Sequence, residues 1–154
     1  MTDYQLLREQ AKALAEDAPW DITAYANISA LLYETLGGLN WAGFYLLRNG
    51  ELVLGPFQGK TACMRIPVGK GVCGTAVKED RIQRVEDVHA FPGHIACDSA
   101  SASEIVLPIH VNGEIIGVLD IDSPILARFT AEDEQGLQGI VKAMEDYLSG
   151  RGTI

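Results

Sequence analysis

Residues 41–57 read WAGFYLLRNGELVLGPF, and this stretch decides the fold class. Hydrophobic side chains dominate Trp41–Leu47 and return over Glu51–Phe57, with Asn49-Gly50 between the two runs. Asn-Gly between two such runs favours a two-residue hairpin turn, so we predict a pair of antiparallel strands. The same pattern recurs downstream, where Asn112-Gly113 separates a predicted strand over Glu104–Val111 from another over Glu114–Asp122.

Helical spacing of apolar residues flanks these hairpins. It predicts helices over residues 3–17 and 22–36, the second with Asp21 as its N-cap and Gly37-Gly38 as its stop. A last helix begins at Thr130, has a capping-box partner in Asp133 and runs to about Ser149.

The middle of the chain is less regular. We predict short strands over Met64–Val68 and Arg81–Val85, with a glycine-rich turn and a short helix to about Asp80 between them. Residues 86–103 have no regular pattern, and loops of this length are often functional. Two hairpins among helices predict an α+β protein with an antiparallel sheet, organised as a single domain over residues 1–154.

Composition restricts the classes of partner. The 154 residues carry a formal net charge of -9, which disfavours nucleic acid and anionic membranes as partners. The polar N-terminus lacks the apolar core of a signal peptide, and no apolar stretch approaches the length of a membrane span. We therefore expect a cytoplasmic protein.

Three cysteines, Cys63, Cys73 and Cys97, are the first candidates for chemistry. An odd and small number argues against a structural disulfide framework, and without a Cys-x-x-Cys pair a structural zinc site is disfavoured. Cys63 and Cys97 lie in predicted loops, where a redox or nucleophilic role and inert burial stand as equal alternatives.

Three acidic residues are the second candidates. Asp120 and Asp122 interrupt an apolar strand two positions apart, so both point to one face of the sheet. Glu104 opens the partner strand, and we expect the three carboxyls to converge near one sheet edge. Crowded carboxyls cannot all ionise, so one should keep its proton near neutral pH and serve as an acid. The alternative is a solvated strand end.

Aromatic and glycine residues complete the set. Trp41 and Tyr45 lie on one strand face, either as ordinary core or as the wall of a pocket for a small apolar group. His89 and His94 belong to the irregular segment, as part of a lid or as solvated side chains. Gly69-x-Gly71-x-x-Gly74 lacks the context of a dinucleotide loop, so we interpret it as a tight strand-to-helix turn.

Four segments together resemble free methionine-(R)-sulfoxide reductases, whose domain is of the GAF type. They are Asn40-Trp41-Ala42-Gly43-Phe44-Tyr45, Leu54-Gly55-Pro56-Phe57-Gln58-Gly59, Gly69-Lys70-Gly71-Val72-Cys73-Gly74 and Gly117-Val118-Leu119-Asp120-Ile121-Asp122-Ser123. The resemblance extends from about residue 20 to residue 148, with all three cysteines at the spacing of the family.

The resemblance implies an antiparallel sheet of about six strands flanked by helices on both sides. It implies Cys97 as the catalytic cysteine, Cys63 as the main resolving cysteine and Cys73 as a secondary thiol. It also implies Glu104, Asp120 and Asp122 as substrate-site acids beside the pocket aromatics Trp41 and Tyr45. The family uses thioredoxin as reductant, needs no metal or organic cofactor, and suggests a homodimer.

These residue types fit the reduction of a sulfoxide. An acid protonates the sulfoxide oxygen, a thiolate attacks the sulfur, and a sulfenic acid forms and then condenses with a second thiol. An external dithiol reduces the resulting disulfide. Two alternatives stay open, namely a GAF-type module that binds a small ligand and a cysteine redox sensor without turnover.

Overall fold

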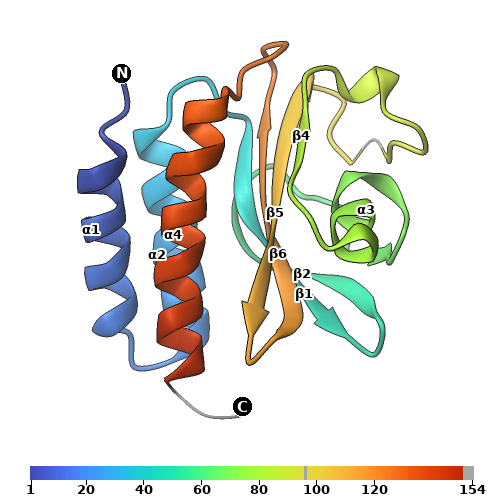
Figure 1. Cartoon of the computed structure of the whole chain (residues 1–154). Helices are drawn as coiled ribbons and strands as arrows, with labels where there is room; N and C mark the ends of the chain where they lie inside the picture. Colours follow the sequence, from blue (N-terminus) through green and yellow to red (C-terminus); the bar gives the residue numbers. More distant parts are fainter. Residues whose placement is uncertain (96, 151–154) are drawn as a thin grey trace.

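The computed structural model describes residues 1–95 and 97–150, and within them the strands form one six-stranded sheet (Figure 1). The strand order is β3-β2-β1-β6-β5-β4, and every neighbouring pair is antiparallel. The strands are β1 (Trp41–Arg48), β2 (Glu51–Gly59), β3 (Arg65–Pro67), β4 (Gln83–Val85), β5 (Ser103–Val111) and β6 (Glu114–Ser123). The predicted α+β class and the two predicted hairpins are confirmed.

Helices cover both faces of the sheet, as expected. Three long helices lie on one face: α1 (Tyr4–Glu16), α2 (Asp21–Thr35) and α4 (Ala131–Ser149) (Figure 1). Of these, α2 and α4 pack on the sheet, and α1 packs on their outer side. The opposite face carries α3 (Gly71–Glu79) and the segment that contains a short 3-10 turn, η1 (Val88–Ala90). Residues 151–154, the end of the predicted domain, lie outside the described residues.

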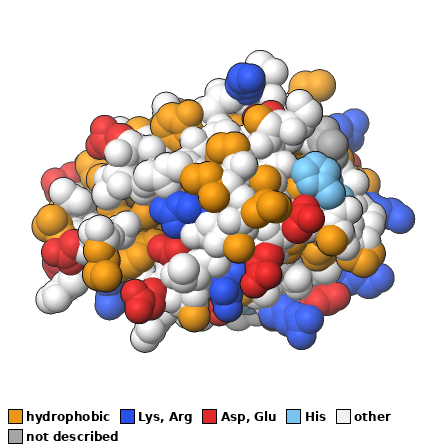
Figure 2. Space-filling model, turned by 90° about the horizontal axis from the view of Figure 1, so that it is seen from above, with side chains coloured by type: hydrophobic (Ala, Val, Ile, Leu, Met, Phe, Trp, Pro, Cys, Tyr) orange, Lys and Arg blue, Asp and Glu red, His pale blue; other side chains and the backbone are white. Residues whose placement is uncertain are grey.

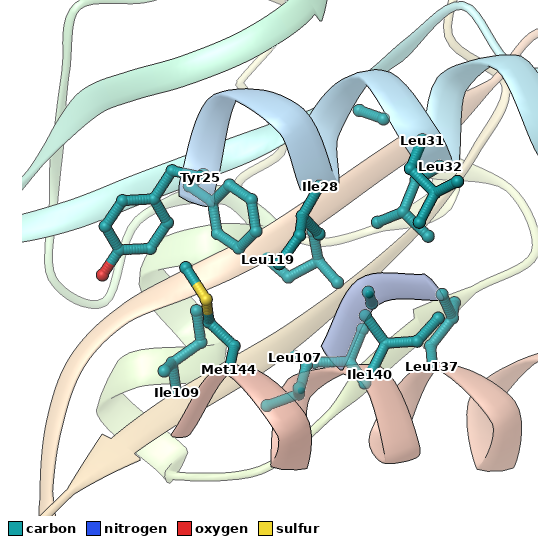
Figure 3. Packing of buried hydrophobic residues seen from close by; sticks show 14 of the residues in the cluster. Tyr25, Ile28, Leu31, Leu32, Leu107, Ile109, Leu119, Leu137, Ile140 and Met144 are labelled. Atoms are coloured by element: carbon teal, nitrogen blue, oxygen red, sulfur yellow. The ribbon is translucent and has the colours of Figure 1, made fainter. Parts of the chain in front are cut away.

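The main core lies between the sheet and the three long helices (Figure 3). Ile28 of α2 and Leu137 of α4 are fully buried against Leu107 of β5 and Leu119 of β6. Alternate residues of the central strands enter this core because side chains of a strand point to opposite faces in turn. The same alternation sends the intervening residues, including Asp120, to the α3 face.

A second and smaller core lies under α3. Trp41 and Tyr45 of β1 pack there with Val106 of β5, Val118 of β6 and Cys73 of α3. All five side chains are buried. The site residues predicted from the sequence therefore share a face with the smaller core and are separated by the sheet from the larger one.

Two of the predicted local signals are confirmed in atomic detail. Thr130 accepts from the backbone N–H of Asp133, and the Asp133 carboxylate accepts from the backbone N–H of Thr130, which together form the capping box of α4. Gly69 and Gly71 adopt positive φ in the turn between β3 and α3. At Gly74 an added Cβ would lie 2.4 Å from the carbonyl oxygen of Pro67, so the turn excludes larger residues.

The predicted N-cap of α2 is wrong by one residue. Trp20 is the N-cap, and its carbonyl oxygen accepts the first helical hydrogen bonds, from Thr23 and Ala24. Asp21 is the first residue of the helix, where a negative charge is favourable beside the free N–H groups. The short strands β3 and β4 begin one and two residues later than predicted, and β3 also ends one residue earlier.

Within the described residues, no helix is both long and apolar enough to cross a membrane. On the face seen from above, acidic and basic side chains are interspersed with hydrophobic ones (Figure 2). This face therefore presents no uniform field of one sign.

Candidate active site

A small cavity of about 40 Å³ opens on the α3 side of the sheet, where β1 begins and β6 ends. It has room for a few water molecules. The residues that line it are Trp41, Tyr45, Ala62, Ile66, Gly71, Val72, Cys73, His94, Ile95, Cys97, Asp98, Ser101, Glu104, Asp120 and Asp122. Every site residue predicted from the sequence except Cys63 is among them.

The three acids converge because of strand register. Glu104 of β5 lies directly opposite Asp122 of β6, and Asp120 follows two positions away on the same face. β6 and β5 are interior strands, so the expected position near a sheet edge is wrong. The acids lie near the ends of interior strands, where neighbouring strands and α3 shield Glu104 and Asp120 from water, while Asp122 is half-buried. Glu104 is 8% exposed and Asp120 is 5% exposed.

Burial raises the pKa of all three carboxyls, and repulsion between them adds to this for Glu104 and Asp122. Desolvation is the main cause for Glu104, and the charges of Asp120 and Asp122 raise its pKa further, well above its usual range. The pKa of Asp122 rises equally far, by desolvation and by the charge of Asp120. Desolvation also raises the pKa of Asp120, but hydrogen bonds from Glu104, Cys73 and Asp122 oppose it. We infer that Glu104 and Asp122 hold protons while Asp120 ionises first.

The cluster lacks a positive partner inside the protein. Among the described residues, no lysine, arginine or histidine forms an ion pair with any of the three acids. The Oδ1 atom of Asp120 is buried and has no hydrogen-bond partner. Buried acceptors are normally satisfied, so this arrangement indicates that a donor or a cation binds here.

Cys63 and Cys97 form a disulfide, with an S–S distance of 2.03 Å and a Cα–Cα distance of 5.4 Å. The bond joins the segment before β3 to the irregular segment before β5. Its two sulfurs have different surroundings, since Cys97 lines the cavity and Cys63, alone among the predicted site residues, does not. In the described part of the chain Cys73 is the free cysteine.

Cys73 belongs to α3, and its side chain lies beside the acid cluster. It is 3% exposed, and its Sγ is 3.9 Å from Oε2 of Glu104. Desolvation, reinforced by the charges of Asp120 and Glu104, raises the pKa of this thiol well above its usual range. Cys73 is therefore a neutral thiol and a poor nucleophile in this state.

The two predicted aromatics pack in the smaller core and also line the cavity. Trp41 and Tyr45 stack with ring centroids 5.8 Å apart, and Phe57 of β2 stacks on Trp41 at 5.1 Å. Tyr45 donates its hydroxyl to the carbonyl oxygen of Cys63 at 2.8 Å, and the indole N–H of Trp41 donates to that of Lys60 at 3.2 Å. These rings therefore belong to the core, line the cavity and hold the segment that carries Cys63.

A polar group beside Cys97 was missed by sequence reasoning. Asn40 donates from Nδ2 to Oδ2 of Asp98 and to Oγ of Ser101, each at 3.0 Å. The backbone N–H of Ala100 donates to the Asp98 carboxylate, and this bond is the main cause of the lowered pKa of Asp98. Asn40 therefore ties the segment that carries Cys97 to the start of β1. Asn40 opens the Asn40–Tyr45 motif, and its position in the sequence does not indicate a contact with Asp98.

The glycine-rich turn forms no dinucleotide site, because it connects an antiparallel strand to α3 rather than opening a βαβ unit. Among the described residues, donor atoms close enough to share one metal ion are found on Cys73, Glu104 and Asp120.

Comparison with known proteins places this geometry in a family. The sequence pattern of the GAF domain matches residues 22–146. The free methionine-R-sulfoxide reductase of Escherichia coli is 60% identical over 146 residues, which cover 95% of this chain and 88% of that protein. The chain belongs to the free methionine-R-sulfoxide reductases of the GAF-domain family.

Solved structures of this family have the same fold. The fRMsr of Staphylococcus aureus in its reduced form is 57% identical and superposes with a TM-score of 0.93 over 96% of both chains. The free methionine-R-sulfoxide reductase of Neisseria meningitidis, in complex with its substrate, is 42% identical with a TM-score of 0.92. That match covers 97% of this chain and 92% of the other. Membership of this reductase family makes the chain an oxidoreductase, and the GAF fold implied by the sequence is confirmed.

Proposed function

We propose that this protein reduces free methionine-(R)-sulfoxide to methionine, with Cys97 as the nucleophile and Cys63 as the resolving thiol. The observation that carries the proposal is one cavity that brings Cys97 together with a cluster of three carboxyls, in which the pKa values of Glu104 and Asp122 are raised well above their usual range. The activity is the one named for the 60% identical relative from Escherichia coli. The residue roles rest on position, since of the two bonded cysteines only Cys97 faces the cavity.

The first step transfers the oxygen of the sulfoxide to a cysteine. Glu104 or Asp122 protonates the sulfoxide oxygen, which makes the sulfur electrophilic. The thiolate of Cys97 attacks the sulfur and forms a transient S–S bond. The oxygen then moves to the Cys97 sulfur as the S–O bond of the substrate and the transient S–S bond break, so methionine leaves and Cys97 becomes a sulfenic acid. The sulfoxide sulfur gains two electrons, and Cys97 loses two. Asp120, the first of the acids to ionise, is the group that we assign to the ammonium of the substrate.

The second step restores the thiols. Cys63 attacks the sulfenic acid of Cys97, water leaves, and the disulfide forms. This is the same bond that joins the two residues in the structure. An external dithiol then reduces the disulfide through a mixed disulfide. We propose thioredoxin as that dithiol and the cytoplasm, a reducing compartment, as the location. A homodimer stays a prediction, which light scattering would test.

The acids also give a reason for choosing the free amino acid. A free methionine sulfoxide brings an α-ammonium to a buried anionic cluster that has no other positive partner among the described residues. A peptide-bound methionine sulfoxide has no such charge, so it would leave a buried carboxylate unpaired. Leaving a buried charged group unpaired costs roughly 1–3 kcal/mol or more.

A coupled assay tests the proposal. The reduced protein is mixed with thioredoxin, thioredoxin reductase and NADPH, and then with free or peptide-bound methionine sulfoxide. We expect steady NADPH consumption with the free amino acid and far slower consumption with the peptide. A single burst of oxidation without turnover would identify a redox sensor, and binding without oxidation would identify a ligand-binding module. Equal rates on both substrates would contradict the assigned role of the acids.

A further inference from the structure

The acid cluster and Cys73 together form a mixed donor set of one thiol and several carboxyls. An ammonium group is recognised by carboxylates alone, yet here a thiol lies among them. The donor atoms of Cys73, Glu104 and Asp120 all lie within 4.8 Å of one another, and all three residues are buried. Sulfur with two carboxylate oxygens is a set that zinc-like cations bind.

We propose that Cys73, Glu104 and Asp120 form a binding site for a thiophilic divalent cation such as Zn²⁺, which would occupy the place of the substrate ammonium. In a tetrahedral zinc site, sulfur and oxygen ligands are about 3.5 Å apart. The observed separation of Cys73 Sγ and Glu104 Oε2 is 3.9 Å, so only a small adjustment is needed.

An independent observation points to a ligand at the same place. Asp120 lines the cavity and is only 5% exposed. Its Oδ1 atom has no hydrogen-bond partner. A cation bound there would satisfy that oxygen.

Charge favours the same conclusion. The cluster has no lysine, arginine or histidine partner among the described residues, so its negative charge is uncompensated whenever more than one acid ionises. A divalent ion would stabilise the ionised forms of Glu104 and Asp120. It would also take the place of the Cys73 thiol proton, which is released to the solvent as the metal–sulfur bond forms.

The disulfide state makes the test selective. When Cys63 and Cys97 are bonded to each other, Cys73 is the thiol left to bind a metal. We would titrate this form of the full chain with Co²⁺ and record the near-ultraviolet band of thiolate-to-cobalt charge transfer. We expect the band in the wild-type protein, its displacement by Zn²⁺, and proton release in weak buffer.

Variants then assign the ligands. Cys73→Ser should abolish the band, and Asp120→Asn should weaken Co²⁺ binding by about tenfold or more. His110→Ala is the matched control, because His110 lies at the other end of β5 from Glu104, pairs with Asp80 and Glu145, and does not line the cavity. It should leave the band and the affinity unchanged.

Two outcomes would overturn the proposal. One is the absence of the band in the wild-type disulfide form at millimolar Co²⁺, a result that needs no variant to fold. The other is a band that persists in Cys73→Ser. Neither outcome bears on sulfoxide reduction, which is measured without added metal, so the failure of this proposal is distinct from a failure of the proposed function.

Discussion

Cys63 and Cys97 are joined by one bond, but only Cys97 faces the cavity. We therefore expect Cys97→Ser to abolish methionine release, since the attacking sulfur is gone. Cys63→Ser should still release one methionine per protein and then turn over poorly with thioredoxin. Quenched-flow measurement of methionine release under single-turnover conditions separates the two steps.

Cys73→Ser serves as the comparison for these variants. A neutral, buried thiol contributes no nucleophile, so single-turnover release should persist in that variant. Full release from Cys97→Ser would refute our assignment of the nucleophile, and undiminished multiple turnover by Cys63→Ser would move the resolving role to Cys73.

The acids should behave as one coupled group. Glu104 and Asp122 have raised pKa values because they are buried beside each other and beside Asp120. The rate of methionine release should therefore fall as pH rises through an apparent pKa above that of an exposed carboxyl, where the proton donor is lost. Glu104→Gln and Asp122→Asn should each lower the rate and shift this limb.

Double variants complete this test. Because the acids share protons, the loss in Glu104→Gln/Asp122→Asn should be smaller than the sum of the single losses. Wild-type rates in all the amide variants with an unmoved pH profile would show that these acids take no part in the reaction.

The sequence indicated some of these residues more clearly than others. Asp120 and Asp122 were predictable as a pair because a strand places alternate residues on one face. The roles of Cys63 and Cys97 came from family resemblance, and the bond between them was not predicted, since no spacing rule selects one pair among three cysteines. The contact of Asn40 with Asp98 joins residues 58 positions apart, so no local pattern reveals it.

At the scale of elements, the β1–β2 hairpin depends on Gly43. A Cβ there would lie 2.3 Å from Cβ and 2.7 Å from Cα of Phe57, close to the register shift of this strand pair. We expect Gly43→Ala to lower the free energy of unfolding by about 2–3 kcal/mol or more, because the strands must separate. Chemical denaturation measures the change.

Gly37→Ala is the matched control for this prediction. An added Cβ at Gly37 meets no atom within 4 Å, and the residue does not have a positive φ. Its effect on unfolding should stay within about 0.5 kcal/mol. Equal effects of the two substitutions would show that the close strand approach at Gly43 does not contribute to stability.

The elements were largely predictable because their signals are local. Asn-Gly turns, the glycine-rich turn and the Thr130–Asp133 capping box each act over a few residues, and all lie where expected. The start of α2 was not predictable in this way, because the N-cap Trp20 makes no side-chain capping hydrogen bond, whereas Asp21 is of a residue type that usually caps helices. Backbone geometry, which the sequence does not display, decided that boundary.

At the scale of the whole molecule, the buried acids make stability depend on pH. Glu104 and Asp122 bind protons more tightly when folded than when unfolded. Their contribution to stability is complete below the ordinary carboxyl pKa and is lost as pH rises toward the raised values. Within that window, the free energy of unfolding falls by about 1.4 kcal/mol per pH unit for each group that stays protonated in the folded state but is ionised in the unfolded state.

The measurement is the free energy of unfolding of the disulfide form between about pH 5 and pH 8. We expect a decline with rising pH that is shallower in Glu104→Gln, which cannot ionise. Asp98 has a lowered pKa, so its contribution to stability is lost only at pH values below the measured range. Asp98→Asn is therefore a suitable control. Parallel curves for the wild type and Glu104→Gln would exclude the raised pKa.

The strand order could not be predicted from hairpins alone. Both hairpins fix neighbours along the chain, but the pairing of β1 with β6 joins residues 71 to 81 positions apart, and this pairing brings Trp41 beside Asp122. The resemblance implied a sheet of about six strands but not their order, so this pairing was not predicted. The acids were therefore expected at an edge, although they lie on central strands.

The two hydrophobic clusters on opposite faces of the sheet have a consequence for amide hydrogen exchange. Exchange should be slowest in β1, β5, β6 and the helices packed on them, which enclose the larger cluster. Amides of α3 and of the segment that carries Cys97 rest on the smaller cluster and should exchange sooner, through local opening rather than global unfolding. We therefore expect the half of the molecule that holds the candidate site to open while the other half stays folded.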